Sequence, residues 1–143
     1  MEITRIFDTF RTAFLANAGD TIADLYDTPF VYFRARQNVV QPERAGFIAD
    51  ANAIREAYAR LGLADMKYTI LSEERFEAGL IIASVEWRYM TAQGDEIVRH
   101  ECTCGLRPHG DHLRFAFHVS HNEYARRPAF VSSAGTVGPE THI

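Results

Sequence analysis

Residues 79–121 contain three apolar-rich runs separated by two short turn sequences, and this stretch decides the fold. The runs read GLIIASVEWRYM (79–90), EIVRHECTCGL (96–106) and HLRFAFHVSH (112–121), and the turns read TAQGD (91–95) and RPHGD (107–111). β-Branched and aromatic residues favour strands, while glycine, proline and aspartate favour turns. The stretch therefore predicts three consecutive antiparallel strands that form a meander.

The chain before the meander predicts two helices and a strand. Apolar side chains near its start recur every three or four positions, which is typical of one face of an amphipathic helix: Ile3, Ile6, Phe7, Phe10 and Phe14. Asp20 or Thr21 is expected to cap a second, short helix, which Pro29 would stop. Residues 30–33 (FVYF) predict a strand.

The following segment predicts a loop, a third helix and another strand. Residues 34–41 are polar and favour a loop in which only Val39 and Val40 would pair. Asp50 is expected to cap a helix that ends before Gly62. Residues 66–76 alternate in the manner of a strand.

This order of elements predicts an α+β fold in which helices cover one face of a mostly antiparallel sheet. A chain of 143 residues suits one domain, here expected over residues 1–128. Residues 129–143 are rich in glycine, serine, threonine and proline and are expected to form a flexible C-terminal tail.

Charge and composition exclude several classes of function. The net charge of −4 comes from intermixed charges without a basic cluster, so nucleic acid is not an expected partner. Apolar runs such as Leu80–Ala83 are far shorter than the ~20 residues of a membrane-spanning helix. The first residues do not resemble a signal peptide, so a cytoplasmic location is expected. Reduced thiols at Cys102 and Cys104 fit that compartment.

Three short motifs and the long aromatic strands carry a resemblance to a known fold family. The motifs are Asn17-Ala18-Gly19-Asp20, Leu25-Tyr26-Asp27 and Ala53-Ile54-Arg55-Glu56-Ala57-Tyr58. In this order they resemble the nuclear transport factor 2-like superfamily, SnoaL-like branch. The resemblance implies a cone in which a curved, mixed sheet wraps three N-terminal helices around an open-ended apolar pocket. It also implies a homodimer through the outer sheet face. Proteins of this superfamily include lyases, isomerases and non-catalytic binding proteins.

The register of the first hairpin predicts which side chains face this pocket. A turn at Gln93–Gly94 places three residues of the inner, apolar face opposite three others: Trp87 opposite His100, Val85 opposite Cys102, and Tyr89 opposite Val98.

The facing of the last strand stays open between two alternatives, because a one-residue change in loop length reverses it. Hydrophobicity alone puts Phe115, Phe117 and Val119 inside. The resemblance instead puts Ala116, His118 and Ser120 inside and leaves the phenylalanines for a dimer partner.

Two histidines on the expected inner wall carry the catalytic hypothesis. His100 and His118 titrate near neutral pH, so they suit acid and base roles next to a carbonyl. The paired histidines resemble those of scytalone dehydratase. The first hypothesis is therefore a cofactor-independent lyase or isomerase that acts on a small, mostly apolar oxygenated molecule. The alternatives are that both histidines only bond within the core, and that the chain is a non-catalytic binding or assembly module.

Further residues are expected to contact the ligand, and no cofactor is expected. These residues are Tyr32, Arg34, Tyr58, Trp87, Tyr89, Cys102 and Ser120. Arg34 could anchor a carboxylate or enolate through its planar guanidinium. No metal is expected either, because parallel side chains on a sheet face fit a tight tetrahedron poorly.

Overall fold

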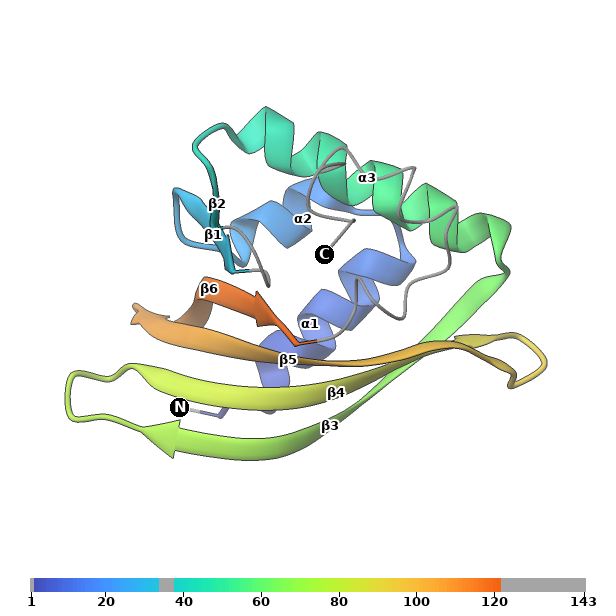
Figure 1. Cartoon of the computed structure of the whole chain (residues 1–143). Coiled ribbons are helices and arrows are strands. Elements are labelled where there is room, and N and C mark those ends of the chain that lie inside the picture. Colours follow the sequence, from blue (N-terminus) through green and yellow to red (C-terminus); the bar gives the residue numbers. More distant parts are fainter. Residues whose placement is uncertain (1, 34–37, 122–143) are drawn as a thin grey trace.

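A computed structural model describes residues 2–33 and 38–121, in which three helices and six strands form. In chain order they are α1 (Thr4–Leu15), α2 (Gly19–Asp24), β1 (Phe30–Phe33), β2 (Asn38–Gln41), α3 (Arg44–Arg60), β3 (Leu63–Arg75), β4 (Ile81–Thr91), β5 (Glu96–His109) and β6 (His112–Ser120). The helices gather on one side of a curved sheet (Figure 1). Arg34 and the tail expected at 129–143 lie outside the described residues.

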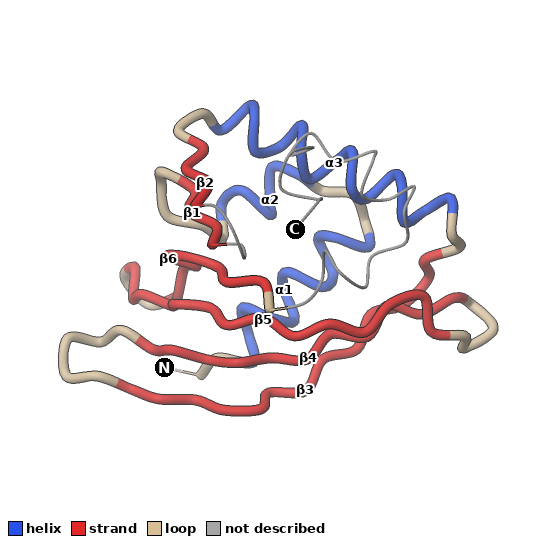
Figure 2. The backbone as a smooth tube through the Cα atoms, viewed as in Figure 1, coloured by secondary structure: helices blue, strands red, loops and turns tan. Residues whose placement is uncertain are grey.

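The sheet has the strand order β2-β1-β6-β5-β4-β3. Neighbouring strands are antiparallel except β1 and β6, which pair in parallel through Tyr32 opposite His118 and Phe33 opposite Val119. The sheet curls toward the helices and encloses them on one side (Figure 2). The fold is therefore the α+β cone that the sequence predicted.

Helix α1 packs its predicted apolar face against the sheet. Ile6, Phe7 and Phe14 are buried there, and the ring of Phe10 lies 5.6 Å from that of Trp87 on β4. The guanidinium of Arg55 on α3 donates hydrogen bonds to the carbonyls of Phe14 (2.8 Å) and Leu15 (3.0 Å). Carbonyls in the last turn of a helix have no partner within it, so these bonds both complete α1 and fix α3 to it.

The predicted register of the first hairpin is confirmed. Trp87 lies opposite His100, Val85 opposite Cys102, and Tyr89 opposite Val98. Gly94 has a φ of 88°, a left-handed conformation that glycine adopts without strain. The turn at 91–95 therefore sets which residues of β4 and β5 face inward.

The prediction that Asp50 caps the third helix is wrong, because α3 begins at Arg44 and Asp50 lies inside it. Pro42 stands just before the first turn, and Phe47 extends the helical spacing of Ile54 and Tyr58 backward along one buried face. No side chain caps the start of the helix, so the usual local signal is missing.

Three other strand boundaries differ from the prediction. Asn38–Gln41, expected in a loop, forms β2 and pairs with β1 through Val39 and Val40. Strand β3 starts directly after α3 rather than at Met66. Strand β5 continues through His109, so the second turn is shorter than expected and Gly110 supplies its positive φ of 65°.

Each alternative for the facing of β6 is right for one half of the strand. Gly105 pairs with Phe117 but Leu106 pairs with Phe115, so Ala116 is an extra residue, a β-bulge. The bulge lets Phe115 and His118 both face the helices, although three positions separate them. Phe117 faces outward over Gly105, where even a Cβ atom would stand 2.1 Å from its ring. The predictions of an inward Phe117 and an outward Phe115 are therefore wrong.

Candidate functional site

A cavity of about 140 Å³ lies between the inner face of the sheet and the three helices. Aromatic side chains form most of its wall, and several polar groups interrupt them. The wall consists of Phe7, Phe10, Phe14, Ile22, Tyr26, Tyr32, Phe47, Asp50, Ala51, Ile54, Trp87, Tyr89, His100, Cys102, Cys104, Phe115 and His118. A void of about 150 Å³ can hold a molecule the size of benzene, so this cavity has room for a one-ring ligand.

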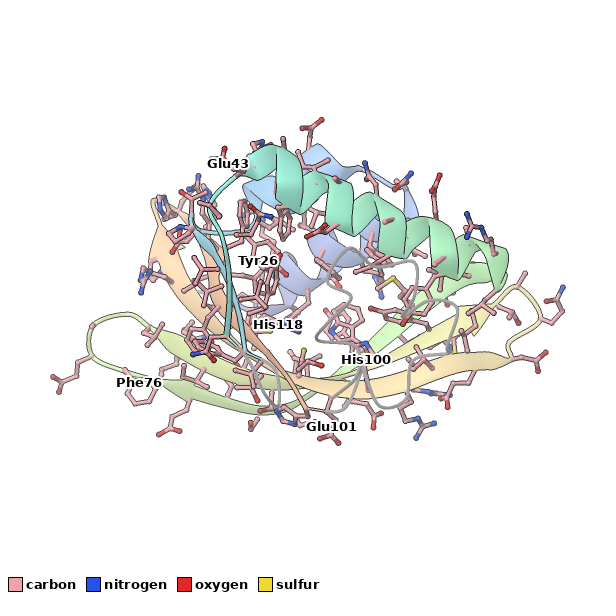
Figure 3. All side chains as sticks on the ribbon, turned by 45° about the horizontal axis from the view of Figure 1, so that its top comes forward. Tyr26, Glu43, Phe76, His100, Glu101 and His118 are labelled. Carbon is pink, nitrogen blue, oxygen red and sulfur yellow. The ribbon has the colours of Figure 1, made fainter. Side chains whose placement is uncertain are left out.

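Both predicted catalytic histidines are on the cavity wall. His100 of β5 is 3% exposed, and its ring meets the ring of Tyr89 edge-on at 5.3 Å. His118 of β6 lies 6.3 Å from the ring of Tyr32, again edge-on. Figure 3 shows His118 and Tyr26 between the sheet and the helices, with Glu101 on the opposite face of the sheet.

The structure brings some of the predicted ligand-binding residues to the cavity and not others. Tyr32, Trp87, Tyr89 and Cys102 line it. Tyr58 lies outside the wall: it is fully buried, and its ring packs 4.9 Å from that of Tyr89.

Ser120 also lies outside the wall, in the ladder position opposite Cys102. Its Oγ is buried without a hydrogen-bond partner among the described residues. Arg34, the proposed anion anchor, lies outside the described residues.

Asp50 is a wall residue that the sequence analysis assigned to another role. It lies on the cavity side of α3 with Ala51 and Ile54. The signal was present: Phe47, Asp50 and Ile54 are spaced by three and four residues, which places a carboxylate on an otherwise apolar helix face. Asp50 is half-buried, so its carboxylate keeps part of its hydration beside the cavity.

Tyr26, which lies just after α2, is another wall residue that the sequence did not place at the site. The chain after α2 runs beside β6, where Tyr26 forms an isolated parallel bridge with Phe115. Its ring lies 4.9 Å from that of Phe115 and 5.0 Å from that of Phe47. The early segment thus adds a phenol to the wall.

The two thiols of the wall are close neighbours. The Sγ atoms of Cys102 and Cys104 lie 3.9 Å apart, and both residues are free cysteines. A hydrogen bond from the Cys104 thiol holds the pKa of Cys102 well below its usual value, and the His118 imidazole acts in the same direction. The same thiol bond and burial raise the pKa of Cys104.

The arrangement combines an apolar wall with two imidazoles, a carboxylate, three phenols and two thiols. Such a wall can hold a small oxygenated molecule and exchange protons with it. Within residues 2–33 and 38–121, no three histidine, cysteine, aspartate or glutamate side chains are grouped so as to hold a metal ion. In the same part of the chain no helix is both long and apolar enough to cross a membrane.

Comparison with known proteins gives a family for the chain. The family described as "NTF2-like protein (DUF6841)" matches residues 1–123, so the chain belongs to it. A search of curated proteins gives no match.

Solved structures resemble the chain at low sequence identity and therefore show the fold alone. A Mycobacterium tuberculosis protein of unknown function has a TM-score of 0.65 at 15% identity, over 83% of this chain and 68% of the other. A putative calcium/calmodulin-dependent protein kinase type II association domain from Thiobacillus denitrificans has a TM-score of 0.65 at 16% identity, over 82% of this chain and 92% of the other. An NTF-2 like protein of unknown function from Shewanella oneidensis has a TM-score of 0.62 at 12% identity, over 82% of this chain and 94% of the other.

Proposed function

We propose that this NTF2-like chain binds a small, mostly apolar oxygenated molecule in its interior cavity and moves a proton next to the carbonyl of that molecule. The observation that carries the proposal is the meeting of His100, His118 and Asp50 on the wall of one aromatic cavity. Such a protein is a cofactor-independent lyase or isomerase. The cavity volume of about 140 Å³ limits the ligand to roughly one ring.

The proton transfer needs a base and a donor within reach of the same ligand. In this proposal one of His118 and Asp50 takes the proton from the carbon next to the carbonyl. His100, or the phenol of Tyr32, donates to the oxygen as negative charge develops there. A positioned acid or base contributes about 10²- to 10⁴-fold to such a step.

Binding can be measured directly, because Trp87 is the only tryptophan of the chain and lines the cavity. Cyclohexanone should change the Trp87 fluorescence with saturation, and benzene, of similar size, should bind more weakly because it cannot use the polar groups. Ala51→Leu should fill the cavity and weaken cyclohexanone binding about tenfold or more, a cost of about 1.4 kcal/mol. Ala49→Leu is the matched control, because Ala49 is exposed on the same helix. Equal binding by both variants would contradict a cavity site.

Proton transfer can be tested before the natural substrate is known. In heavy water the protein should speed the exchange of the α-hydrogens of cyclohexanone for deuterium, and NMR measures the rate of this exchange. Of His118→Gln and Asp50→Asn, the substitution that removes the base should lower this rate about 10²-fold or more. His112→Gln, at the exposed first position of β6, is the control and should exchange as the wild type does.

The alternative function is a non-catalytic binding or assembly module. It is favoured by the size of the cavity, which is below the ~300 to 1,000 Å³ of typical ligand pockets. Cyclohexanone that binds without faster hydrogen exchange would support this module and contradict the enzyme.

The same proposal includes a homodimer through the outer sheet face. Phe33 and Phe117 are partly exposed there, with ring centroids 5.9 Å apart. Apolar rings on an outer face suit burial by a second copy. The association domain from Thiobacillus denitrificans, named for assembly, shares the fold. In a reducing compartment such as the cytoplasm, Cys102 and Cys104 would remain thiols.

Sedimentation velocity tests this interface. The wild type should sediment as a dimer, and Phe117→Glu should shift it to a monomer. Glu56→Lys, a charge change at an exposed position of α3, should leave the dimer intact. A wild-type monomer at all concentrations would refute the interface.

A further inference from the structure

The pair of thiols in the cavity wall has no role in the proton transfer proposed above. Cys102 and Cys104 are alternate residues of β5, only 2% and 3% exposed, and both face the cavity. His118 lies directly opposite Cys104 in the neighbouring strand and lines the same wall. Two nucleophilic sulfurs and an imidazole thus meet at one place beside an open volume.

Two common uses of paired cysteines do not fit this geometry. A disulfide needs its sulfurs about 2.05 Å apart, whereas these lie at 3.9 Å. A structural metal site needs about four ligands, and the described residues offer no group of three. The pair is therefore best explained as thiols.

The surroundings favour ionisation of one thiol over the other. Cys104 donates a hydrogen bond to Cys102, and His118 and His100 favour the negative charge, so the pKa of Cys102 lies well below its usual value. The pKa of Cys104 is raised by the same bond and by burial. The other titratable groups that face the cavity are Asp50, Tyr26, Tyr32 and Tyr89. Cys102 is then the nucleophile of the pair, and Cys104 supports it.

We infer that Cys102 adds covalently to α,β-unsaturated carbonyl compounds that enter the cavity, with His118 as the proton carrier. The inference rests on the proposed function, because the compound must occupy the same cavity. A thiolate is a soft nucleophile and attacks the electron-poor β-carbon of such a compound.

The step balances without a further reactant. The Cys102 proton passes to His118, and a bond forms between Sγ and the β-carbon. The π electrons of the carbon–carbon double bond move toward the carbonyl as an enolate. His118 then returns the proton to the α-carbon, which leaves a saturated carbonyl joined to Cys102 as a thioether. The reverse sequence releases the compound.

The size of the cavity and the low pKa of Cys102 set the expected result. About 140 Å³ admits a one-ring enone such as 2-cyclohexen-1-one. At pH 7 an ordinary thiol is only about 3% ionised, so the lowered pKa gives Cys102 a larger thiolate fraction, partly offset by its lower intrinsic nucleophilicity. Addition about tenfold faster than to glutathione is expected.

The test is intact-mass spectrometry of the full chain after incubation with 2-cyclohexen-1-one. One adduct per chain should form, and peptide mapping should place it on Cys102. Because the chain has only two cysteines, Cys102→Ser leaves Cys104 alone and should abolish the adduct. Cys104→Ser should keep the adduct but form it more slowly.

The role of His118 is read from the pH profile, which a purely structural role would not move. Between about pH 8 and pH 6 the rate of the wild type should fall less than the rate of glutathione does. In His118→Gln the rate should fall more steeply than in the wild type. Saturating cyclohexanone should protect both proteins, and the far-ultraviolet circular dichroism of each variant confirms that it folds.

The outcomes separate this inference from the proposed function. If cyclohexanone changes the Trp87 fluorescence but the enone forms no adduct, or forms it on Cys104, the inference is overturned and the binding site stands. If neither compound binds, both fail. Equal rates and equal pH profiles for the wild type and His118→Gln would overturn the proton-carrying role.

Discussion

The two faces of the β4–β6 meander come from alternate residues of the same strands, yet their polar groups behave differently. On the outer face, Arg88 and Arg99 both pair with Glu96, at 3.1 and 2.9 Å. Thr103 lies within hydrogen-bonding distance of Ser84 (2.9 Å), also on that face. These groups are partly exposed to water and pair with one another.

On the inner face, the polar groups are buried in an aromatic wall. His100, Cys102 and Cys104 are almost fully buried, beside Trp87 and Tyr89. A charge there loses its hydration, so each neighbouring dipole changes the balance between protonated and ionised forms. The outer face therefore holds its charges in contact with water and the inner face holds its ionisable groups away from water, although one register sets both.

The largest expected loss of stability distinguishes Phe115 from Phe117, two residues of β6. Phe115 contacts the rings of Phe7, Phe10 and Tyr26, so Phe115→Ala should lower the free energy of unfolding by about 3–5 kcal/mol. Phe117→Ala on the outer face should cost clearly less, because Phe117 is only partly buried. Urea denaturation measures both. Equal losses at low protein concentration would break the distinction between the faces.

A smaller effect tests the packing of the bulge. Gly105→Ala would place a Cβ atom 2.1 Å from the ring of Phe117. Such overpacking should cost about 1–3 kcal/mol. In a chain that already carries Phe117→Ala, the same substitution should cost much less, because the obstructing ring is gone. A double-mutant cycle from urea unfolding measures this coupling, and additive losses would show that the ring does not oppose the new methyl group.

A third prediction concerns a phenol at the edge of the inner face. Tyr68 donates a hydrogen bond of 2.7 Å to Asp8, and burial, that bond and the Asp8 charge raise the pKa of Tyr68 to about 12. A raised pKa stabilises the fold below the unfolded value of about 10, and this contribution is lost as the pH rises through about 12.

Tyr68→Phe should therefore reduce stability by less than about 1 kcal/mol near neutral pH, because the side chain is partly exposed. The difference from the wild type should vanish toward pH 12. Urea unfolding across this range measures it, and the phenolate absorbance gives the titration. A Tyr68 titration at the ordinary value would contradict the hydrogen-bonded phenol.

The smallest expected change in stability concerns Glu96 on the outer face. Hydrogen bonds from Arg88 and Arg99 lower the pKa of Glu96. A lowered pKa stabilises the fold above the unfolded value of 4.5, and this stabilisation is lost as the pH falls below it. Glu96→Gln should cost a few tenths of a kcal/mol at pH 7 and nothing in acid, because the pair is well exposed. Glu56→Gln on the exposed side of α3 is the control in the same unfolding measurement.

Much of the fold could be predicted because its signals are local. The turn around Gln93–Gly94 determines the register of β4 and β5, and this register alone brings Trp87 and His100 to the same face. The spacing of apolar residues determines the buried side of α1 in the same way. The α+β order of elements then leaves few arrangements.

The rest depended on tertiary contacts that no local pattern contains. The bulge at Ala116 is compatible with the packing of Phe117 over Gly105, two residues on different strands. Asp50 was assigned to a helix start because aspartate is a common cap, whereas α3 begins without a side-chain cap. Its place in the cavity follows only when the helix is extended back to Arg44.

The bulge also affects how the strand tolerates insertions and deletions. Side chains alternate with a period of two, so removal of one residue from a regular strand reverses the facing of everything that follows it. Deletion of Ala116 is the exception, because it removes the extra residue of the bulge: Phe115 would stay inward, Phe117 outward and His118 inward, in regular alternation. The bulge thus gives β6 one position at which a residue can be lost during evolution without reversing the two faces of the strand.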